Sequence, residues 1–411
     1  MKKAFYFLAV FFLLASCEDD KISPGNINPS LENTKAIEVT PPATIVLKGK
    51  DLDAATEVLL NNRPLTIVSK TESELEVQVP SGAFSGTAVV KFPDPDISLR
   101  KYIKVIDANV TTKDLPLSHL MKVDFLGGGN VLKYGGDGIV YRSTDGSTNW
   151  QSIYESVHVS PNVPFKAYDA SHIWVLLGGA KQMAITQNGG ETWKEITTLP
   201  DHIINDLFFL SLEKVVVTTI DLNTGSGAIY TTNDGGQKWT KAYESSSAIV
   251  SNLKLAYSGG NSMYLASPGG RLMLKTTDGG NTWSESPLLV NLGTPKTGSP
   301  ISFISEQVGW AYNQPGLKSD EPGIYKTTNG GASWFPVAKP ELDYDELISA
   351  VRFWSDNVGV AVTTKGGYMQ TDDGGVSWKL YYMPGTNPQL LDLDQDNLYF
   401  YSDKLLIKAI R

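Results

Sequence analysis

The feature that most constrains the fold of this chain is an octet that recurs six times between residues 143 and 378. The copies are STDGSTNW (143–150), TQNGGETW (186–193), TNDGGQKW (232–239), TTDGGNTW (276–283), TTNGGASW (327–334) and TDDGGVSW (371–378). The tryptophans that end them stand 43, 46, 44, 51 and 44 residues apart. A period in the forties between short strand-like segments is typical of β-propeller blades, and it predicts an all-β propeller.

The chemistry of the octet predicts a structural role. The Asp carboxylate can accept hydrogen bonds from its own turn, Gly adopts a positive φ at no steric cost, and Trp buries a large apolar area. Where Asn replaces Asp, an amide oxygen can accept the same bond. Because nothing in the octet activates a nucleophile, we predict scaffold residues, not catalytic acids, at Asp145, Asn188, Asp234, Asp278, Asn329, Asp373, Trp150, Trp193, Trp239, Trp283, Trp334 and Trp378.

The segments around the octets predict the layout of the blades. In the fifth repeat, strand-like segments at 300–303, 308–312 and 323–327 precede the octet, which would turn the chain into a fourth strand. Three further segments, LLDLD, NLYFYSD and LLIKAIR, follow the last octet. They predict a seventh blade, whose fourth strand would come from residues 110–121 and close the ring.

The octets match the Asp-box, or bacterial neuraminidase repeat. The cadence F…VGWA…G.Y.TT(D/N)GG.(S/T)W around them resembles the propellers related to the photosystem II stability/assembly factor. The resemblance covers residues 108–411 and is specific for the fold. It implies an Asp-box propeller and, for function, the assembly of a protein complex.

The N-terminus has the pattern of a targeting segment. Lys2 and Lys3 precede an apolar run, which ends in Leu14-Ala15-Ser16-Cys17. This resembles a bacterial lipobox and implies a signal peptide over 1–16, cleavage before Cys17 and lipidation of its thiol. Residues 17–35 read as a linker, and the acidic run at 18–20 resembles the surface-export signal of Bacteroidetes lipoproteins. We expect a lipid-anchored outer-membrane protein at the cell surface, with the periplasmic face as the alternative.

A first domain is expected over residues 36–107. Short runs that alternate apolar and polar residues, such as ELEVQVP and GTAVVKF, are separated by turn residues and predict a small β-sandwich. The order of these runs resembles the IPT/TIG immunoglobulin-like family, whose members act as spacers or protein-contact modules. The complete fold prediction is therefore an immunoglobulin-like sandwich followed by a seven-bladed propeller over 108–411.

Charge and ligand spacing exclude several classes of function. The formal net charge is −9 and no basic stretch is present, which argues against nucleic acid and against electrostatic binding to anionic lipid. The four histidines show no metal-ligand spacing, and the acidic run at 392–397 lacks the glycine of a calcium loop. We expect no metal and no cofactor.

Catalysis finds little support in the sequence. A sialidase on this fold needs three arginines in the central funnel, but Arg142 and Arg271 fall beside or within the third strand of a blade. Other Asp-box glycosidases use paired carboxylates across a cleft, and no local motif marks such a pair. We therefore expect the protein to be non-catalytic, and a glycosidase is the alternative that the sequence leaves open.

Candidate binding residues lie in connections between blades, where a rigid scaffold positions loops. Tyr344 stands between Asp343 and Asp345 in the connection 340–346, and Arg352 and Trp354 follow on one side of the next strand. A second such connection carries His202. We take these six residues as candidate ligand contacts.

The main functional hypothesis from the sequence is non-catalytic recognition of a glycan at the cell surface, with a role in nutrient capture. The alternative is a protein-binding scaffold or an assembly factor of an outer-membrane complex. A glycoside hydrolase is the third interpretation. An aromatic cleft without paired carboxylates would favour a glycan, and a broad apolar-rimmed face would favour a protein partner.

Overall fold

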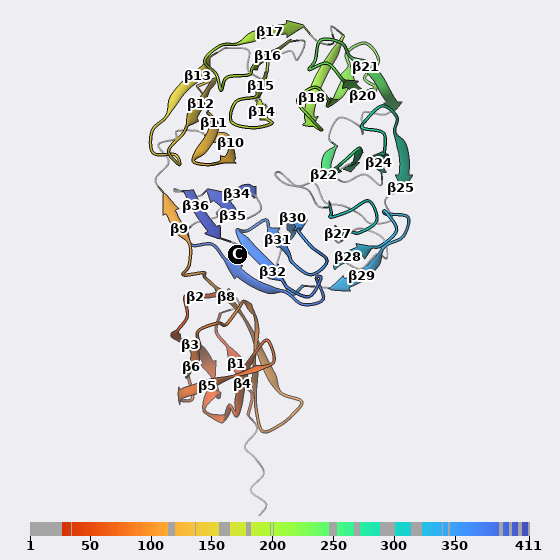
Figure 1. The fold of residues 1–411 in the computed structure, drawn as a ribbon. Helices are drawn as coiled ribbons and strands as arrows, with labels where there is room; N and C mark the ends of the chain where they lie inside the picture. The colour runs from red at the N-terminus through yellow and green to blue at the C-terminus, as the bar shows by residue number, and fades with distance from the viewer. Residues whose placement is uncertain are drawn as a thin grey trace, which may run out of the picture.

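The computed structural model describes residues 27–409 apart from a set of intervening segments (Figure 1). Those segments are 34, 114–119, 136, 156–164, 178–181, 198, 200, 246–252, 267–271, 288–300, 314–322, 339, 344–345, 386–388, 394–396 and 402–404. The described residues form β-strands and one short 3-10 helix, η1 (Leu52–Ala54). No helix among them is long and apolar enough to cross a membrane.

Seven four-stranded sheets are arranged in a ring, which confirms the predicted propeller (Figure 1). Blades 1 to 6 each consist of four consecutive antiparallel strands, with the first strand nearest the centre of the ring. Blade 1 contains β10 (Leu120–Gly127), β11 (Asn130–Gly135), β12 (Ile139–Ser143) and β13 (Gln151–Glu155). Blade 2 contains β14 (Phe165–Ala167), β15 (Ile173–Leu176), β16 (Gln182–Thr186) and β17 (Lys194–Thr197). Blade 3 contains β18 (His202–Phe209), β19 (Val215–Asp221), β20 (Gly227–Thr232) and β21 (Thr240–Ser245).

Blades 4 to 6 repeat this layout, and in blade 5 the first three strands fall where the segments before the octet predict them. Blade 4 contains β22 (Lys254–Gly259), β23 (Ser262–Ala266), β24 (Leu272–Thr276) and β25 (Ser284–Pro287). Blade 5 contains β26 (Ile301–Phe303), β27 (Gly309–Asn313), β28 (Gly323–Thr327) and β29 (Phe335–Ala338). Blade 6 contains β30 (Ile348–Phe353), β31 (Gly359–Thr363), β32 (Gly367–Thr371) and β33 (Lys379–Tyr382). Each octet is the turn between the third and fourth strands. The second strands are largely buried, and β31 (Gly359–Thr363) is buried along its whole length, because each lies between two neighbouring blades.

Blade 7 joins the two ends of the propeller. Its inner strands are β34 (Gln389–Leu393), β35 (Asn397–Tyr401) and β36 (Leu405–Ala409), and its fourth strand is β9 (Thr111–Lys113). β9 pairs antiparallel with β36, with Leu405 opposite Lys113. Figure 1 shows this N-terminal strand beside the C-terminal ones. The predicted ring closure is confirmed, with residues 111–113 supplying the strand.

Stacked aromatic rings connect neighbouring blades. Trp310 of β27 in blade 5 stacks on Phe353 of β30 in blade 6, with ring centroids 3.8 Å apart, and its indole N–H donates to the carbonyl of Gly374 at 2.9 Å. Phe125 of blade 1 stacks on Tyr399 of blade 7 at 3.6 Å, so the ring is closed by packing as well as by β9. Such pairs add to the apolar area that each blade buries against the next.

The first domain forms one sheet with its own core. Its strands run in the order β1-β3-β6-β5-β4-β7-β8-β2. A strict alternation of buried and exposed residues, clearest in β3, points one side of each strand into a core that contains Leu47, Leu75 and Val77. The strands are β1 (Ser30–Leu31), β2 (Ile37–Val39), β3 (Ala43–Lys50), β4 (Glu57–Leu60), β5 (Arg63–Lys70), β6 (Glu74–Val79), β7 (Gly86–Lys91) and β8 (Ser98–Val105). Its membership of the IPT/TIG family stays a prediction.

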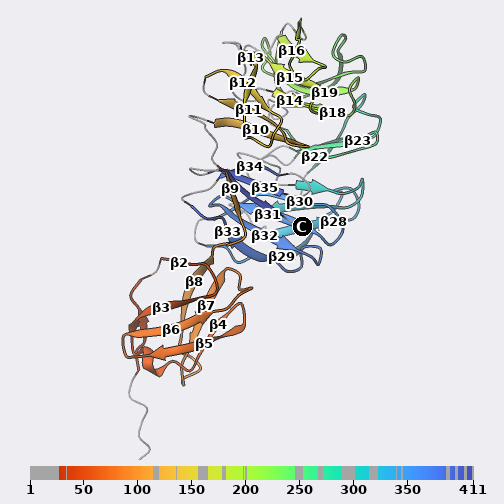
Figure 2. The same ribbon diagram turned by 60° about the vertical axis from the view of Figure 1, so that its left-hand side comes forward.

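The first domain contacts the outer edge of blade 6 (Figure 2). The backbone N–H of Ser85 donates to the carbonyl of Leu380 at 2.8 Å, and that of Asp107 donates to the carbonyl of Tyr382 at 2.9 Å. Ile106 forms a parallel bridge with Tyr382. The chain leaving the first domain thus covers part of the otherwise exposed edge of β33, a common way to protect an edge strand.

Candidate functional site

The acidic residues of the octets are occupied within their own turns. The Asp278 carboxylate accepts hydrogen bonds from the Thr276 hydroxyl at 2.8 Å and from the amides of Asn281 and Thr282, both at 3.0 Å. In the first octet, hydrogen bonds from the backbone and side chain of Asn149 and from Ser143 hold the pKa of Asp145 at about 2. An ionised carboxylate that accepts several local donors is a turn-forming group, and it is poorly placed to act as a general acid.

The octet tryptophans fasten these turns to the blades. The indole N–H of Trp193, Trp239, Trp283 and Trp378 donates to a glycine carbonyl three residues earlier, at 2.9–3.2 Å. The first octet carries a departure from this pattern, because Ser147 takes a φ of 73° at a position where other copies have Gly. A non-glycine residue in this region is strained, in agreement with the degenerate sequence of that octet.

Two pairs of opposite charges lie on the innermost strands of blades 1 to 3. Lys122 and Asp124 of β10 are 3.3 Å apart, and Lys166 of β14 pairs with Asp206 of β18 at 2.9 Å. The Lys122 ammonium also lies 4.3 Å from the centre of the Phe165 ring. Burial lowers the pKa of Lys122, with Asp124 opposing that effect. This ring-centre cluster was not anticipated from the sequence, although the charges in LMKVDFLG and HIINDLFF interrupt otherwise apolar strands.

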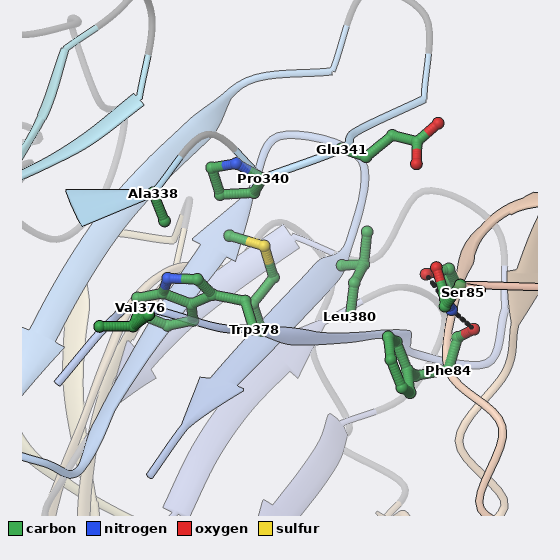
Figure 3. Close-up of a pocket in the computed structure, with 10 residues that line it drawn as sticks. Phe84, Ser85, Ala338, Pro340, Glu341, Val376, Trp378 and Leu380 are labelled. Carbon is green, nitrogen blue, oxygen red and sulfur yellow. Dashed lines mark hydrogen bonds between the residues drawn. The ribbon is translucent and has the colours of Figure 1, made fainter. Parts of the chain in front are cut away.

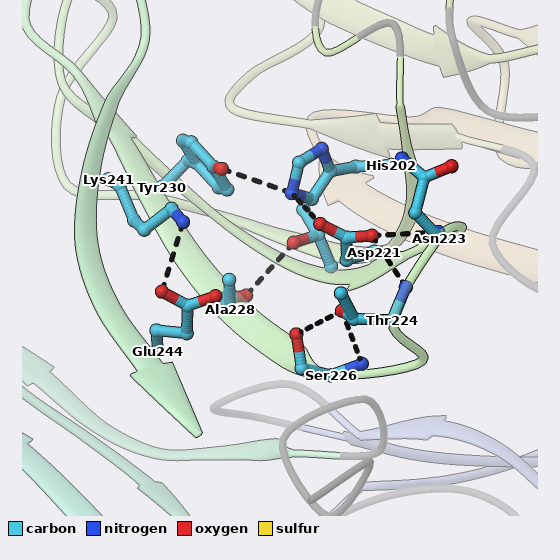
Figure 4. Close-up of polar contacts among 10 residues, drawn as sticks. His202, Asp221, Asn223, Thr224, Ser226, Ala228, Tyr230, Lys241 and Glu244 are labelled. Carbon is cyan, nitrogen blue, oxygen red and sulfur yellow. Dashed lines mark hydrogen bonds and ion pairs between the residues drawn. The ribbon is translucent and has the colours of Figure 1, made fainter. Parts of the chain in front are cut away.

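His202 belongs to a polar cluster at one end of blade 3 (Figure 4). Its Nε2 atom is 3.0 Å from the Tyr230 hydroxyl and 3.7 Å from an Asp221 carboxylate oxygen. The other Asp221 oxygen accepts from the amides of Asn223 and Thr224, which lowers the pKa of Asp221. The β19–β20 loop is therefore held by its own hydrogen bonds, and it presents Leu222 with 49% of its surface exposed.

The connection 340–346 lies against the first domain. The Asp343 carboxylate is 3.0 Å from the Lys104 ammonium of β8, and the Glu341 carboxylate accepts a hydrogen bond from the Thr87 hydroxyl. Tyr344 and Asp345 lie outside the described residues, as does Cys17. Part of this candidate binding loop thus belongs to the contact between the domains.

Arg352 and Trp354 lie together, as their spacing in the sequence suggests. The Arg352 guanidinium is 5.9 Å from the centre of the Trp354 ring. The indole N–H of Trp354 is buried and finds no hydrogen-bond partner in the described part of the chain. Arg352 and Asp343 belong to blade 6 and the connection before it, whereas His202 belongs to blade 3, so the candidate contacts fall in two separate regions of the ring.

Metal ligands do not cluster in the part of the chain that the structure describes. No group of three or more His, Cys, Asp or Glu residues is placed there to hold an ion.

Comparison with known proteins supports the propeller assignment. The family model described as photosynthesis system II assembly factor YCF48 matches residues 105–269, from the end of the first domain into blade 4. The propeller is similar to the YCF48 assembly factors. A structure of YCF48 bound to D1 peptide is 16% identical, covers 75% of this chain and 99% of that chain, and has a TM-score of 0.56.

Two further solved structures share the fold. YCF48 from Cyanidioschyzon merolae is 19% identical over 74% of this chain and 98% of that chain, with a TM-score of 0.51. A catalytically inactive virginiamycin B lyase from Staphylococcus aureus with quinupristin is 13% identical over 72% and 98%, with a TM-score of 0.52. No curated protein matches the chain. At these identities the solved structures show a common fold and no more.

Proposed function

We propose that this protein is a non-catalytic, protein-binding scaffold or assembly factor that uses its YCF48-like propeller to hold a partner polypeptide. The observation that carries the proposal is the match of residues 105–269 to a family model of an assembly factor. One similar structure is that of YCF48 with a D1 peptide bound, which gives a precedent for peptide binding by this architecture.

The charged groups of the propeller suit recognition better than proton transfer. Asp278 is held by its turn, and Lys166 and Asp206 neutralise one another near the ring centre. Such groups are already satisfied and hold the scaffold in one shape. General acid–base catalysis instead needs a titratable group whose proton is free to move toward a substrate.

We place the principal contact at the blade 3 rim, which comprises His202, Asp221, Leu222, Thr224 and Tyr230. Hydrogen bonds within the cluster fix its shape before a partner arrives, so little conformational entropy is lost on binding. Exposed Leu222 supplies an apolar anchor, and the surrounding polar groups supply orientation.

A protein partner is preferred over the glycan that the sequence suggested. The glycan hypothesis drew on the connection 340–346, where Asp343 is paired with Lys104 of the first domain. The family match concerns an assembly factor, and one of the similar structures holds a bound peptide. Both considerations favour the scaffold alternative.

The lipid anchor at Cys17 remains part of the proposal, because it would hold the propeller close to membrane-protein partners. Incorporation of labelled palmitate into the intact chain and its loss in Cys17→Ala tests this location. Unchanged labelling in that variant would remove the anchor from the proposal.

The binding function is tested by cross-linking purified residues 21–411 to native membranes. We expect specific protein cross-links that Leu222→Asp abolishes. The matched control is Val68→Asp, because Val68 is 54% exposed on the first domain, away from the rim. Equal cross-linking by all three proteins would refute the rim. An absence of protein cross-links, together with selective retardation by one polysaccharide in affinity electrophoresis, would restore the glycan hypothesis.

A further inference from the structure

A cavity of about 230 Å³ lies in the seam between the first domain and blade 6 (Figure 3). Both domains contribute walls, so the cavity exists only while they are in contact. Figure 3 shows Trp378 and Leu380 on the propeller side and Phe84 on the side of the first domain. The apolar part of the lining includes Phe84, Pro340, Met369, Val376, Trp378 and Leu380.

The walls of this seam cavity are held in place by hydrogen bonds. The Ser85 N–H donates to the carbonyl of Leu380 at 2.8 Å, and the Asn61 side-chain amide donates to the carbonyl of Phe84 at 2.8 Å. The Trp378 indole donates to the carbonyl of Gly375 at 2.9 Å. A ligand would enter a preformed site and would lose little affinity to ordering the protein.

The volume limits what can enter. Pockets for drug-sized molecules usually measure about 300–1,000 Å³. The seam cavity is smaller, so it suits a single large side chain better than a sugar chain. Single aromatic or aliphatic side chains that fill such pockets are the usual anchors of protein interfaces.

The lining specifies the chemistry of that side chain. Val376 leaves 65% of its surface exposed, although it adjoins the half-buried Trp378. Met369 adds a polarizable thioether, which adapts to side chains of different shape. Met369 is itself only 1% exposed, so the apolar surface that an occupant would remove from water belongs to Val376 and the half-buried Trp378, and its removal favours an apolar occupant.

Charge defines the surroundings of the occupant. Glu341 lines the cavity, and its carboxylate accepts a hydrogen bond from the neutral Thr87 hydroxyl. It forms no ion pair with any other described residue. A negative charge beside an apolar cavity is complementary to a cation on the partner, next to the anchoring side chain.

We propose that the seam cavity binds one large apolar side chain of a partner polypeptide, with an adjacent basic residue that pairs with Glu341. This rests on the proposed protein-binding function, and it adds a second contact that the propeller cannot form without the first domain. The first domain is then part of the binding platform, because Phe84 and Ser85 complete the cavity.

The test measures binding of defined probes to residues 21–411 labelled with ¹³C at the methionine methyl groups. The probes are N-acetyl-Phe-Lys-amide, N-acetyl-Phe-Glu-amide and N-acetyl-Ala-Lys-amide. The Met369 signal is assigned with Met369→Leu, and Met183, buried between other strands, serves as the internal reference. We expect a saturable shift of Met369 with Phe-Lys, about fivefold weaker binding of Phe-Glu, and no saturation with Ala-Lys.

Two variants localise the effect. Val376→Asp should weaken Phe-Lys binding at least tenfold, whereas the exposed control Val68→Asp should leave it unchanged. Glu341→Gln should preserve binding of the Phe probes but remove the preference for Lys. Absence of a saturable Met369 shift, or an equal response to all three probes, would overturn the proposal.

The outcome is independent of the membrane cross-linking experiment. Probe binding without any membrane partner would leave the seam cavity standing and refute the assembly function. Cross-linking through the blade 3 rim without probe binding would support the assembly function and refute the seam cavity as a binding site.

Discussion

Replacing octet tryptophans by phenylalanine tests how much their hydrogen bonds contribute to the propeller. The Trp193 indole donates to the carbonyl of Gly190 at 3.1 Å and to that of Ile153 in blade 1 at 2.7 Å. Ile153 falls at a register shift between β12 and β13, where the regular ladder is interrupted. The indole therefore satisfies a carbonyl that a β-bulge leaves without a ladder partner.

Trp334 provides a matched control within the same chain. It ends the fifth octet and is half-buried like Trp193, but its N–H is buried and finds no hydrogen-bond partner among the described residues. The change from indole to phenyl removes similar apolar area at both positions. The difference between the two variants therefore isolates the hydrogen bonds.

The expected difference follows from these contacts. Each lost hydrogen bond costs about 0.5–1.5 kcal/mol net. Because the single N–H of Trp193 is shared between two carbonyls, Trp193→Phe should lower the free energy of unfolding by about 0.5–1.5 kcal/mol more than Trp334→Phe. In the second variant, removing an unsatisfied buried donor offsets part of the cost of the smaller ring.

Urea unfolding followed by tryptophan fluorescence is a suitable assay. All nine tryptophans lie between residues 150 and 378, so the signal reports on the propeller and not on the first domain. Circular dichroism checks that each variant folds. Equal destabilisation by the two substitutions would show that ring volume alone matters, and it would refute the assigned role of the indole N–H at the bulge.

Three further predictions concern other parts of the propeller. Ser147→Gly should stabilise it by about 0.5–1 kcal/mol, because Gly relieves the left-handed backbone at φ 73°, and no rise in the urea midpoint would contradict this. The pKa of Asp278 is held at about 2, so its carboxylate contributes stability that is complete above about pH 4 and is lost as the pH falls through 2. Asp278→Asn should therefore lose less stability than the parent protein when it is titrated through this window, and equal losses in the two proteins would argue against the hydrogen bonds of the turn. Lys166→Met should destabilise by about 2–3 kcal/mol by leaving Asp206 buried and unpaired, whereas Lys166→Met/Asp206→Leu should recover most of that loss in thermal unfolding.

The sequence predicts the propeller well because its defining interactions are local. The octet places donor and acceptor within four residues, as in the bond from Thr282 to Asp278. The spacing of these turns gives six blades, one for each octet. The three strand-like segments after residue 378 predict a seventh blade, which needs a fourth strand from elsewhere in the chain. Hydrophobic alternation and turn residues supply the rest, since they depend on neighbouring positions only.

Contacts between distant segments could not be anticipated in the same way. Lys104 meets Asp343, and Lys166 of blade 2 meets Asp206 of blade 3, through the geometry of the assembled ring. No local pattern distinguishes such a lysine from a solvated one. The seam cavity also has no local signature in the sequence, because its walls come from two domains.

The polar groups at the seam indicate that the first domain has a defined orientation on the propeller. Glu346 is buried, and its carboxylate accepts from the hydroxyls of Thr363 and Tyr382. The Tyr382 ring in turn lies 4.9 Å from the ammonium of Lys104. Burial raises the pKa of Tyr382, so its hydroxyl remains a donor across the neutral range.

A purely flexible spacer would gain nothing from such a network. Buried polar groups are costly when they lose their partners, so the contacts of Lys104 with Asp343 and with the Tyr382 ring, which cross between the domains, disfavour orientations in which the seam opens. Asp107 extends this constraint to blade 7, because its carboxylate is 2.8 Å from the Lys408 ammonium and accepts from the Tyr368 hydroxyl of blade 6. The seam thus couples the first domain to two blades, and a partner bound at the seam cavity would be held at a fixed position relative to the blade 3 rim.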